Sequence, residues 1–461
     1  MTTRLNNHRV FAAAGDLLAV GIVVHLALAT ASAEQDSTLP ASISSEASID
    51  ALASCSNSNC HGGTRGDIWE QSYTLWAARD PHADAYAVLN RSASRKMIAK
   101  LHGGAEIEDA AYRQYIDTHC AVCHATTETA SATRSHRDHF SAGVTCGSCH
   151  GAAENWLDGH LRKNPPEQAR ATVGDADSPL WRYTNVDYGL RDLNDEITRA
   201  RTCVGCHVGS AGDATTPRRN VNHDLIAAGH PRLAFEYTSH VANLPSHWDE
   251  EPIESADYQW AVGQLVAADA AVELLLARVE SGVWPEFSEY NCASCHHHLL
   301  GVDNPPASLS KGTVYDWGSW YFPLAVAAAP NAVELTDDLT ALRKAMSPLV
   351  PDKQQVKPAA ERVRGTLQQA IANLEPTTTG ESIARQFIGG LPLQIEWDVA
   401  VQAYLWHAHR QAATDSNSQE LQRLFQALDP KGDRNGPLWL HNEPNRVKVH
   451  QALRALDKPE N

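Results

Sequence analysis

The sequence predicts a mainly α-helical protein, with short helices and long turns up to about residue 300 and longer helices after it. Between residues 55 and 296 there is little of the sustained alternation of polar and apolar residues that strands require. Within this part, residues 256–281 are an exception: their apolar side chains recur at helical spacing and end at Ser-Gly, which is a common helix terminus.

Four amphipathic segments follow after about residue 330. They read ALRKAMSPLV, ERVRGTLQQAIANLE, WDVAVQAYLWHAHRQAA and SQELQRLFQALD. We expect this C-terminal third to form a helical bundle that braces the rest of the chain. The pattern does not require it to be an independent domain.

All 10 cysteines belong to motifs that end in histidine, so no thiol is left for a disulfide or a free nucleophile. Four motifs have the form C-x-x-C-H, and the first is stretched, with four residues between its cysteines. The motifs are Cys55/Cys60/His61, Cys120/Cys123/His124, Cys146/Cys149/His150, Cys203/Cys206/His207 and Cys292/Cys295/His296.

This pattern is typical of covalent haem attachment, in which two thiols add to the vinyl groups of one porphyrin and the following histidine binds the iron. A zinc site would combine cysteine pairs in fours and would not need a histidine after each pair. A redox dithiol would occur once, on a βαβ pattern. The sequence therefore predicts five covalent haem c groups, with short helices and loops around stacked haems.

The second axial ligand of each iron decides its chemistry, because an iron with two histidines transfers electrons whereas an open face can bind a substrate. Four histidines are the strongest distal candidates. His82 lies in DPHADAYAVL at the start of a helix, and His160 follows the third motif by ten residues. His223 and His230 are seven residues apart, which would place them on one face of a helix.

Ten further histidines are weaker candidates for the same role. They are His102, His119, His136, His139, His240, His247, His297, His298, His407 and His409. No residue is assigned a catalytic role.

The N-terminus resembles an export signal. Arg4 and Arg9 precede an apolar run that ends in Ala-Ser-Ala at 31–33, a plausible cleavage site, with an uncleaved membrane anchor as the alternative. We expect three parts: a signal peptide at 1–33, a pentahaem domain at 34–310 and a helical region at 311–461. The mature protein is expected to be periplasmic or otherwise exported, without an integral membrane segment.

The chain is acidic, with 38 basic against 55 acidic side chains and a formal net charge of −17. This charge gives no electrostatic reason to bind nucleic acid. It would favour an encounter with a basic redox partner, although it also suits a merely soluble surface.

The haem region resembles the multihaem c-type cytochromes of the cytochrome c-554 family (c-552/c-554 domain), within the hydroxylamine oxidoreductase-like multihaem superfamily. The resemblance covers residues 50–300 and rests on CHGG, DPHADAY, the closely spaced pair CAVCH…GVTCGSCHG, and CVGCH. It implies a mainly helical protein with stacked haem pairs that carries electrons between redox proteins. It also supports the five motif histidines as proximal ligands and His82 and His160 as distal ligands.

The sequence departs from that family in two respects. The family typically has four haems, whereas five motifs occur here, and the segment NHDLIAAGHPRLAFEYTSH and the long C-terminal third lie outside the basic pattern. Every motif ends in histidine, unlike the catalytic haem of pentahaem nitrite reductase, which uses lysine.

Three functions remain open from the sequence. The favoured one is periplasmic electron transfer through five haems, mostly ligated by two histidines, between other redox proteins as donor and acceptor. The alternative is an oxidoreductase that acts on a small nitrogen or sulfur compound at one five-coordinate haem, with Arg232 and the segment YDWGSWYFP (315–323) as possible pocket residues. A third is a structural subunit of a larger complex.

Overall fold

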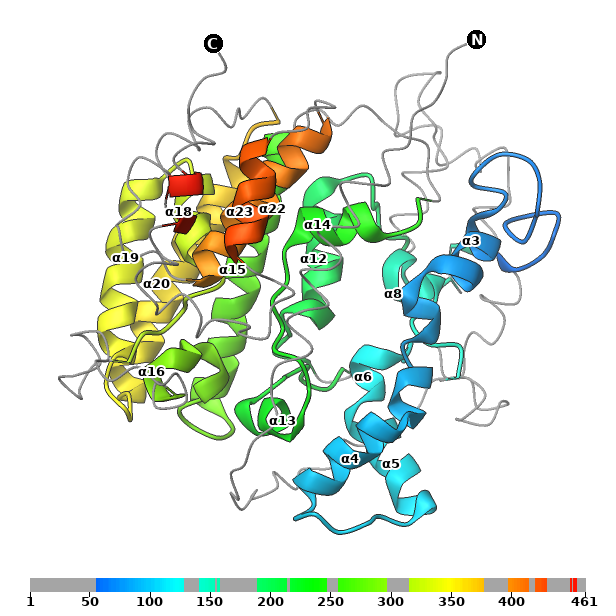
Figure 1. Ribbon diagram of the computed structural model, residues 1–461, viewed down its shortest axis with the longest axis horizontal. Coiled ribbons are helices and arrows are strands. Elements are labelled where there is room, and N and C mark those ends of the chain that lie inside the picture. The colour runs from blue at the N-terminus through cyan, green and yellow to red at the C-terminus, as the bar shows by residue number, and fades with distance from the viewer. Residues whose placement is uncertain are drawn as a thin grey trace, which may run out of the picture.

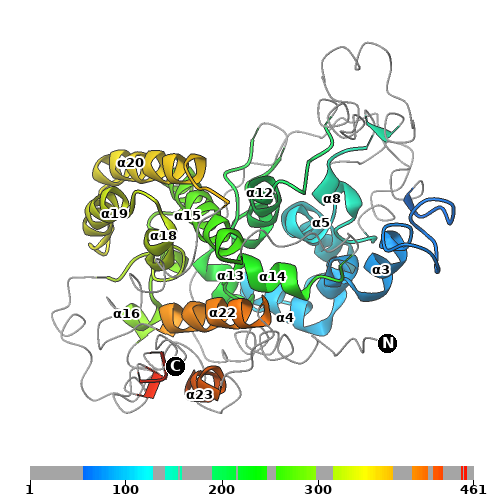
Figure 2. The ribbon, with the colours of Figure 1, turned by 90° about the horizontal axis from the view of Figure 1, so that it is seen from above.

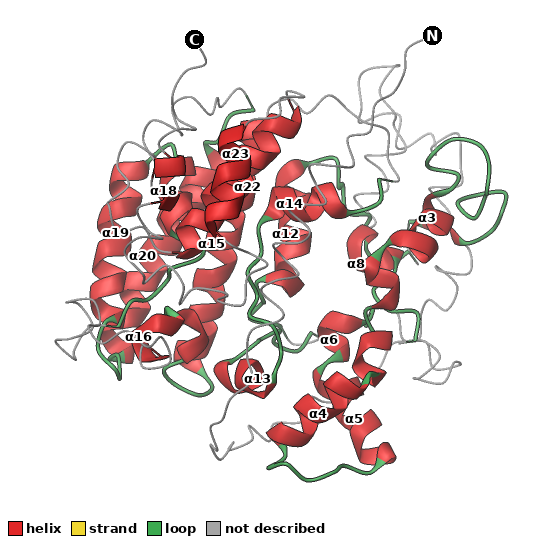
Figure 3. Cartoon of the chain, viewed as in Figure 1, coloured by secondary structure: helices red, strands yellow, loops and turns green. Residues whose placement is uncertain are grey.

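The structure is a computed structural model that describes most of the chain after residue 54. The described residues are 55–127, 141–153, 156–157, 189–213, 216–246, 256–296, 315–376, 397–413, 419–428, 448–449 and 451–453. Helices joined by loops make up this described part (Figure 3). Its only β pairing consists of two isolated bridges, Ser210 with Arg219 and Tyr290 with Trp317. The mainly helical fold class predicted from the sequence is confirmed.

Short helices form the N-terminal region, which lies on the right of Figure 1. They are α3 (Ser72–Arg79), η1 (Pro81–Asp84), η2 (Ala87–Asn90), α4 (Ser92–Leu101), α5 (Asp109–His119), α6 (Ala121–His124) and α8 (Cys146–His150). The described part of this region has one small side-chain cluster, which joins Tyr86, Leu89, Ile98, Tyr112, Ile116, Ala121 and Ala125.

A central group of helices carries the fourth motif and several histidines. It consists of α12 (Glu196–His207), α13 (His223–Ala228) and α14 (Tyr237–Asn243). Arg219 donates from Nε to the Val122 carbonyl at 2.8 Å, and Lys100 donates from Nζ to the Ala228 carbonyl at 3.1 Å. These bonds tie the central helices to the N-terminal region.

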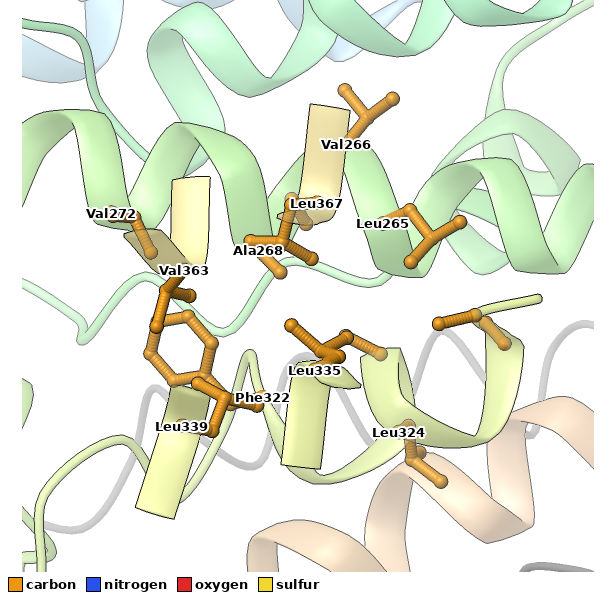
Figure 4. Packing of buried hydrophobic residues seen from close by; sticks show 14 of the residues in the cluster. Leu265, Val266, Ala268, Val272, Phe322, Leu324, Leu335, Leu339, Val363 and Leu367 are labelled. Carbon is orange, nitrogen blue, oxygen red and sulfur yellow. The ribbon is translucent and has the colours of Figure 1, made fainter. Parts of the chain in front are cut away.

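The longest helix, α15 (Ala256–Glu280), organises the second half of the molecule. It lies between α12 on one side and α18 (Pro323–Ala328), α19 (Ala332–Met346) and α20 (Lys353–Ala372) on the other (Figure 2). Leu265, Ala268 and Val272 of α15 meet side chains of α19 and α20 there, among them Leu335 and Leu367 (Figure 4). By length and composition α15 could cross a membrane, but 67% of its apolar window is buried inside the protein, as is typical of a core helix.

The remaining described helices complete this half. They are η3 (Phe287–Glu289), α16 (Cys292–His296), α22 (Trp397–Ala413) and α23 (Gln419–Leu428). A second apolar cluster joins α22 and α23 through Tyr404, Leu421 and Leu424. The helices predicted in the C-terminal third are therefore present, as is the one predicted at 256–281.

The predicted division of the chain stays a prediction. The signal segment 1–33 and the boundary at residue 310 both lie outside the described residues.

Candidate functional site

Four of the five cysteine motifs lie on helical turns, as the two-residue spacing predicts. α6 contains Cys123 and His124, α8 and α16 coincide with the third and fifth motifs, and α12 ends with the fourth. Because one helical turn separates residues i and i+3, each turn places its two thiols on one side.

The first motif is instead a turn. The amide nitrogens of Cys60 and Gly62 both donate to the Asn57 carbonyl, at 2.9 and 3.0 Å. A Cβ added at Gly62 would lie 1.9 Å from the Ser56 oxygen, so only glycine allows this close approach. The four residues between Cys55 and Cys60 thus fold back on themselves, as expected for a stretched motif.

The thiols of different motifs meet in pairs. The thiols of Cys55 and Cys146 lie close enough to shift each other's pKa, and Cys206 likewise lies close enough to raise the pKa of Cys123. Cys149 also lies close enough to Cys203 to raise the pKa of the Cys203 thiol. None of the 10 cysteines forms a disulfide. The first four motifs therefore share one neighbourhood, although they come from residues 55 to 207.

Two motif histidines face a predicted distal histidine. The rings of His124 and His230 have their centroids 6.4 Å apart, with planes at 89°. Those of His223 and His296 are 6.1 Å apart, with planes at 9°. Two imidazoles on opposite sides of one metal ion have ring centres about 6 Å apart, because each metal–nitrogen bond is about 2 Å and each ring centre lies about 1 Å further out. Both pairs therefore fit the axial positions of a haem iron.

His207 of the fourth motif has two histidine neighbours. Its ring centroid lies 6.0 Å from that of His82, at 88°, and 5.1 Å from that of His240, at 71°. Phe235 also packs on both His207 and His240. The donor set at the fourth motif thus fits a haem with two axial histidines as well.

Comparison with known proteins gives one match. Residues 54–151 match the family model described as cytochrome c554 and c-prime. This segment is similar to a c-type cytochrome family. Neither curated proteins nor solved structures give a match. The matched segment contains the first three motifs and His82, and a c-type cytochrome carries covalently attached haem and transfers electrons.

Hydrogen bonds at Nδ1 orient several of the histidines. His61, His124 and His230 each place Nδ1 against a backbone carbonyl, of Trp69, Ala85 and Pro231 respectively, at 2.8 Å. A carbonyl oxygen only accepts, so in each ring Nδ1 carries the hydrogen and Nε2 keeps its lone pair. This is the usual arrangement of a metal-bound histidine.

His82 differs because its Nδ1 partner is a carboxylate. Its Nδ1 lies 2.9 Å from Oδ1 of Asp80, which also accepts the His82 amide hydrogen at 2.9 Å. Burial lowers the pKa of His82, but the hydrogen bond and charge of Asp80 outweigh burial and leave the pKa raised. Asp80 therefore makes His82 a stronger donor than the histidines that face carbonyl groups.

Burial keeps several other histidines neutral. It lowers the pKa of His207 to about 3, with a further contribution from neighbouring histidines, and that of His240 to about 4. It also lowers the pKa of His124 and His230. Only the neutral ring can bind a metal, so these residues are ready to act as ligands near neutral pH.

The structure corrects one detail of the sequence analysis. The expectation that His223 and His230 share a helix face is wrong, because α13 ends at Ala228. Gly229, with φ of 128°, caps the helix, and Pro231 follows His230. The two histidines consequently face different motifs.

The remaining predicted ligands are distributed as follows. His160 lies outside the described residues, and His150 is the last residue of α8. Among the weaker candidates, His407 and His409 are buried on α22, far along the chain from the motifs. The sequence placed His240, which faces His207, among the weaker candidates and gave no sign of the contact, and it missed the hydrogen bonds of Asp80. The Asp-Pro-His order was a visible signal for Asp80, since an aspartate two residues before a histidine at a helix start can bond both its amide and its ring.

Proposed function

We propose that the protein is a periplasmic electron carrier with five covalent haem c groups, mostly ligated by two histidines. Each motif would hold one haem through its two thioethers and its histidine. The distal ligands would come from His82, His160, His223 and His230. Bound haem would supply reversible one-electron exchange at iron.

One observation carries this proposal: histidines from distant segments oppose motif histidines at the spacing of axial ligands. The pairs of 6.4 and 6.1 Å join residue 124 to 230 and residue 223 to 296. Iron with both axial positions filled by histidine stays six-coordinate in both oxidation states, which favours electron transfer over substrate binding.

The thiol contacts give further support. Because motifs one and three meet at Cys55 and Cys146, and motifs two and four at Cys123 and Cys206, their haem groups would be neighbours. α13 carries His223 at its first residue, and His230 follows two residues after its end, so this short helix would link the fifth haem to the second. Such proximity suits electron transfer from haem to haem.

The alternative function, an oxidoreductase at one open haem, has a cavity in its favour. A cavity of about 60 Å³ lies between α13, α15 and residues 317–322, with Arg232, Arg278, Trp317 and Tyr321 in its wall. Arg232 is paired with Asp398 and Arg278 with Glu289, so both cations are already neutralised. No histidine lines the cavity in the described part of the chain. These features favour packing over substrate binding.

The test combines haem counting with voltammetry on the purified protein. Pyridine haemochrome absorbance and intact mass should give five covalent haems per chain. Protein films should show reversible one-electron waves that nitrite, hydroxylamine and sulfite leave unchanged. A catalytic current with any of these compounds would favour the oxidoreductase, and fewer than five haems would refute the pentahaem assignment.

A further inference from the structure

We propose that His240 is a further distal haem ligand and that it and His82 serve two different irons, those of the third and fourth motifs. The inference rests on the five-haem function proposed above. With His160, His223 and His230, these two residues would supply five distal histidines for five irons.

The fold fixes the ring of His240. α14 begins after Glu236, a buried N-cap whose carboxylate accepts hydrogen bonds from the amide groups of Thr238 and Ser239, at 3.3 and 2.7 Å. In the last turn of this helix, Nδ1 of His240 lies 2.7 Å from the Glu236 carbonyl oxygen. Nδ1 must therefore donate, and Nε2 keeps its lone pair, as in the rings of His124 and His230.

His240 also lies where a ligand is needed. Its ring contacts His207 of the fourth motif and Phe235, with centroid distances of 5.1 and 4.5 Å. A surface histidine or a helix cap would have no reason to face the iron-binding residue of a motif. The contact, the bond at Nδ1 and the burial of the ring together give His240 the surroundings of the other predicted ligands.

His82 and His240 cannot both complete the same iron. A haem iron has four porphyrin nitrogens and two axial positions, and His207 would occupy one axial position. His82 is tied to the third motif through its backbone, since its carbonyl accepts the Val144 amide hydrogen at 2.9 Å, two residues before Cys146. A Cβ at Gly143 would lie 2.5 Å from the same carbonyl, which shows how closely these segments pack. The backbone of His82 therefore packs on the segment before the third motif while its ring faces His207 of the fourth, so His82 and His240 would serve one iron each.

The test counts the irons that have lost an axial ligand in single and double variants. His82→Ala, His240→Ala and the double variant are purified with their haem content measured, and high-spin ferric haem is quantified by low-temperature EPR. We expect about one high-spin iron in each single variant and about two in the double variant, with exogenous imidazole restoring the low-spin signal. Asn243→Ala in the same helix is the control, because the Asn243 side chain donates to the Ser239 carbonyl and has no ring nitrogen to offer an iron. It should give none.

Two results would overturn the inference: no high-spin iron in His240→Ala, or only one in the double variant. His240→Met distinguishes loss of a ligand from misfolding. Methionine can replace histidine as an axial ligand, and it raises the reduction potential. We expect this variant to stay low-spin with one haem at a higher potential; unchanged potentials would contradict ligation. High-spin haem in the unmodified protein would instead count against the proposed function, so the two failures are distinguishable.

Discussion

The N-terminal region and the α15–α20 bundle are both helical, but they are held together differently. In the described residues, the main N-terminal cluster contains seven buried apolar side chains, whereas the cluster around α15 contains 36. The N-terminal helices are short, and several end in motif or ligand residues. The bundle helices are long and carry continuous apolar faces.

This difference indicates two sources of stability. Burial of apolar side chains is the main favourable contribution to folding and grows with the apolar area removed from water. The bundle has enough such area in its own side chains. The N-terminal region has little, so we infer that its folding depends on covalently attached haem, whose porphyrin is itself a large apolar surface.

Producing the protein without haem should change the relative stability of the two regions most. We expect amide hydrogens of α4 and α5 to exchange at nearly the rate of an unfolded chain, while those of α15 and α20 remain protected. Hydrogen exchange with mass spectrometry measures both regions in one sample. Equal protection in the two regions would show that the N-terminal side-chain cluster suffices.

Truncation in the bundle core should lower stability without changing the haem region. Leu339 is fully buried in α19, so Leu339→Ala should cost about 2–5 kcal/mol of unfolding free energy. Val333→Ala in the same helix is the control, because Val333 is 79% exposed. Urea unfolding followed by far-ultraviolet circular dichroism gives the difference, while the haem absorption of the folded variant should match that of the unmodified protein.

The ion pair between Arg232 and Asp398 should hold α22 against the segment that joins α13 to α14. Arg232 follows His230 by two residues, and its Nη1 lies 3.0 Å from Oδ2 of Asp398, whose side chain is only 5% exposed. Among the described residues, Arg232→Ala would leave that buried carboxylate with the Ser319 hydroxyl as its remaining partner, at a cost of about 3 kcal/mol.

Thermal unfolding of Arg232→Ala should show this loss, with Lys357→Ala as the matched control. Lys357 pairs with Glu280 at an exposed site, so its removal should leave the transition unchanged. If both variants unfold like the unmodified protein, the buried pair does not stabilise the packing of α22 on that segment.

Removal of the Asp80 carboxylate should have a smaller and more local effect. A charged hydrogen bond at Nδ1 makes His82 a stronger donor and favours ferric iron. Asp80→Asn should change the free-energy difference between ferric and ferrous iron by about 1 kcal/mol. This change raises one reduction potential by on the order of 50 mV. Asp84→Asn in the same turn is the control, because Asp84 is exposed and makes no such bond to His82. Potentiometric titration should show one shifted haem in the first variant and none in the second.

Local sequence patterns predicted the helices and motif turns of this molecule. They did not predict which histidines from separate segments face one another. The helices at 256–280 and 397–413 follow from apolar spacing alone, and the motif turns from the two-residue gap between cysteines. The opposition of His223 to His296, and of His124 to His230, depends on how separate segments pack, which no local pattern encodes. The predicted shared face of His223 and His230 failed because Gly229 ended the helix between them. His240 stood among the weaker candidates because its contact with His207 depends on the same long-range packing.

Low-temperature EPR of the oxidised protein shows whether each haem iron has both axial positions filled. The sample is one whose haem content has been measured by pyridine haemochrome. If two histidines ligate each iron, we expect five haems with only low-spin ferric signals. The His124–His230 pair, with perpendicular rings, and the His223–His296 pair, with nearly parallel rings, should give distinguishable low-spin species. A high-spin signal that responds to nitrite, hydroxylamine or cyanide would contradict the account, because it would reveal an open iron and favour an enzyme.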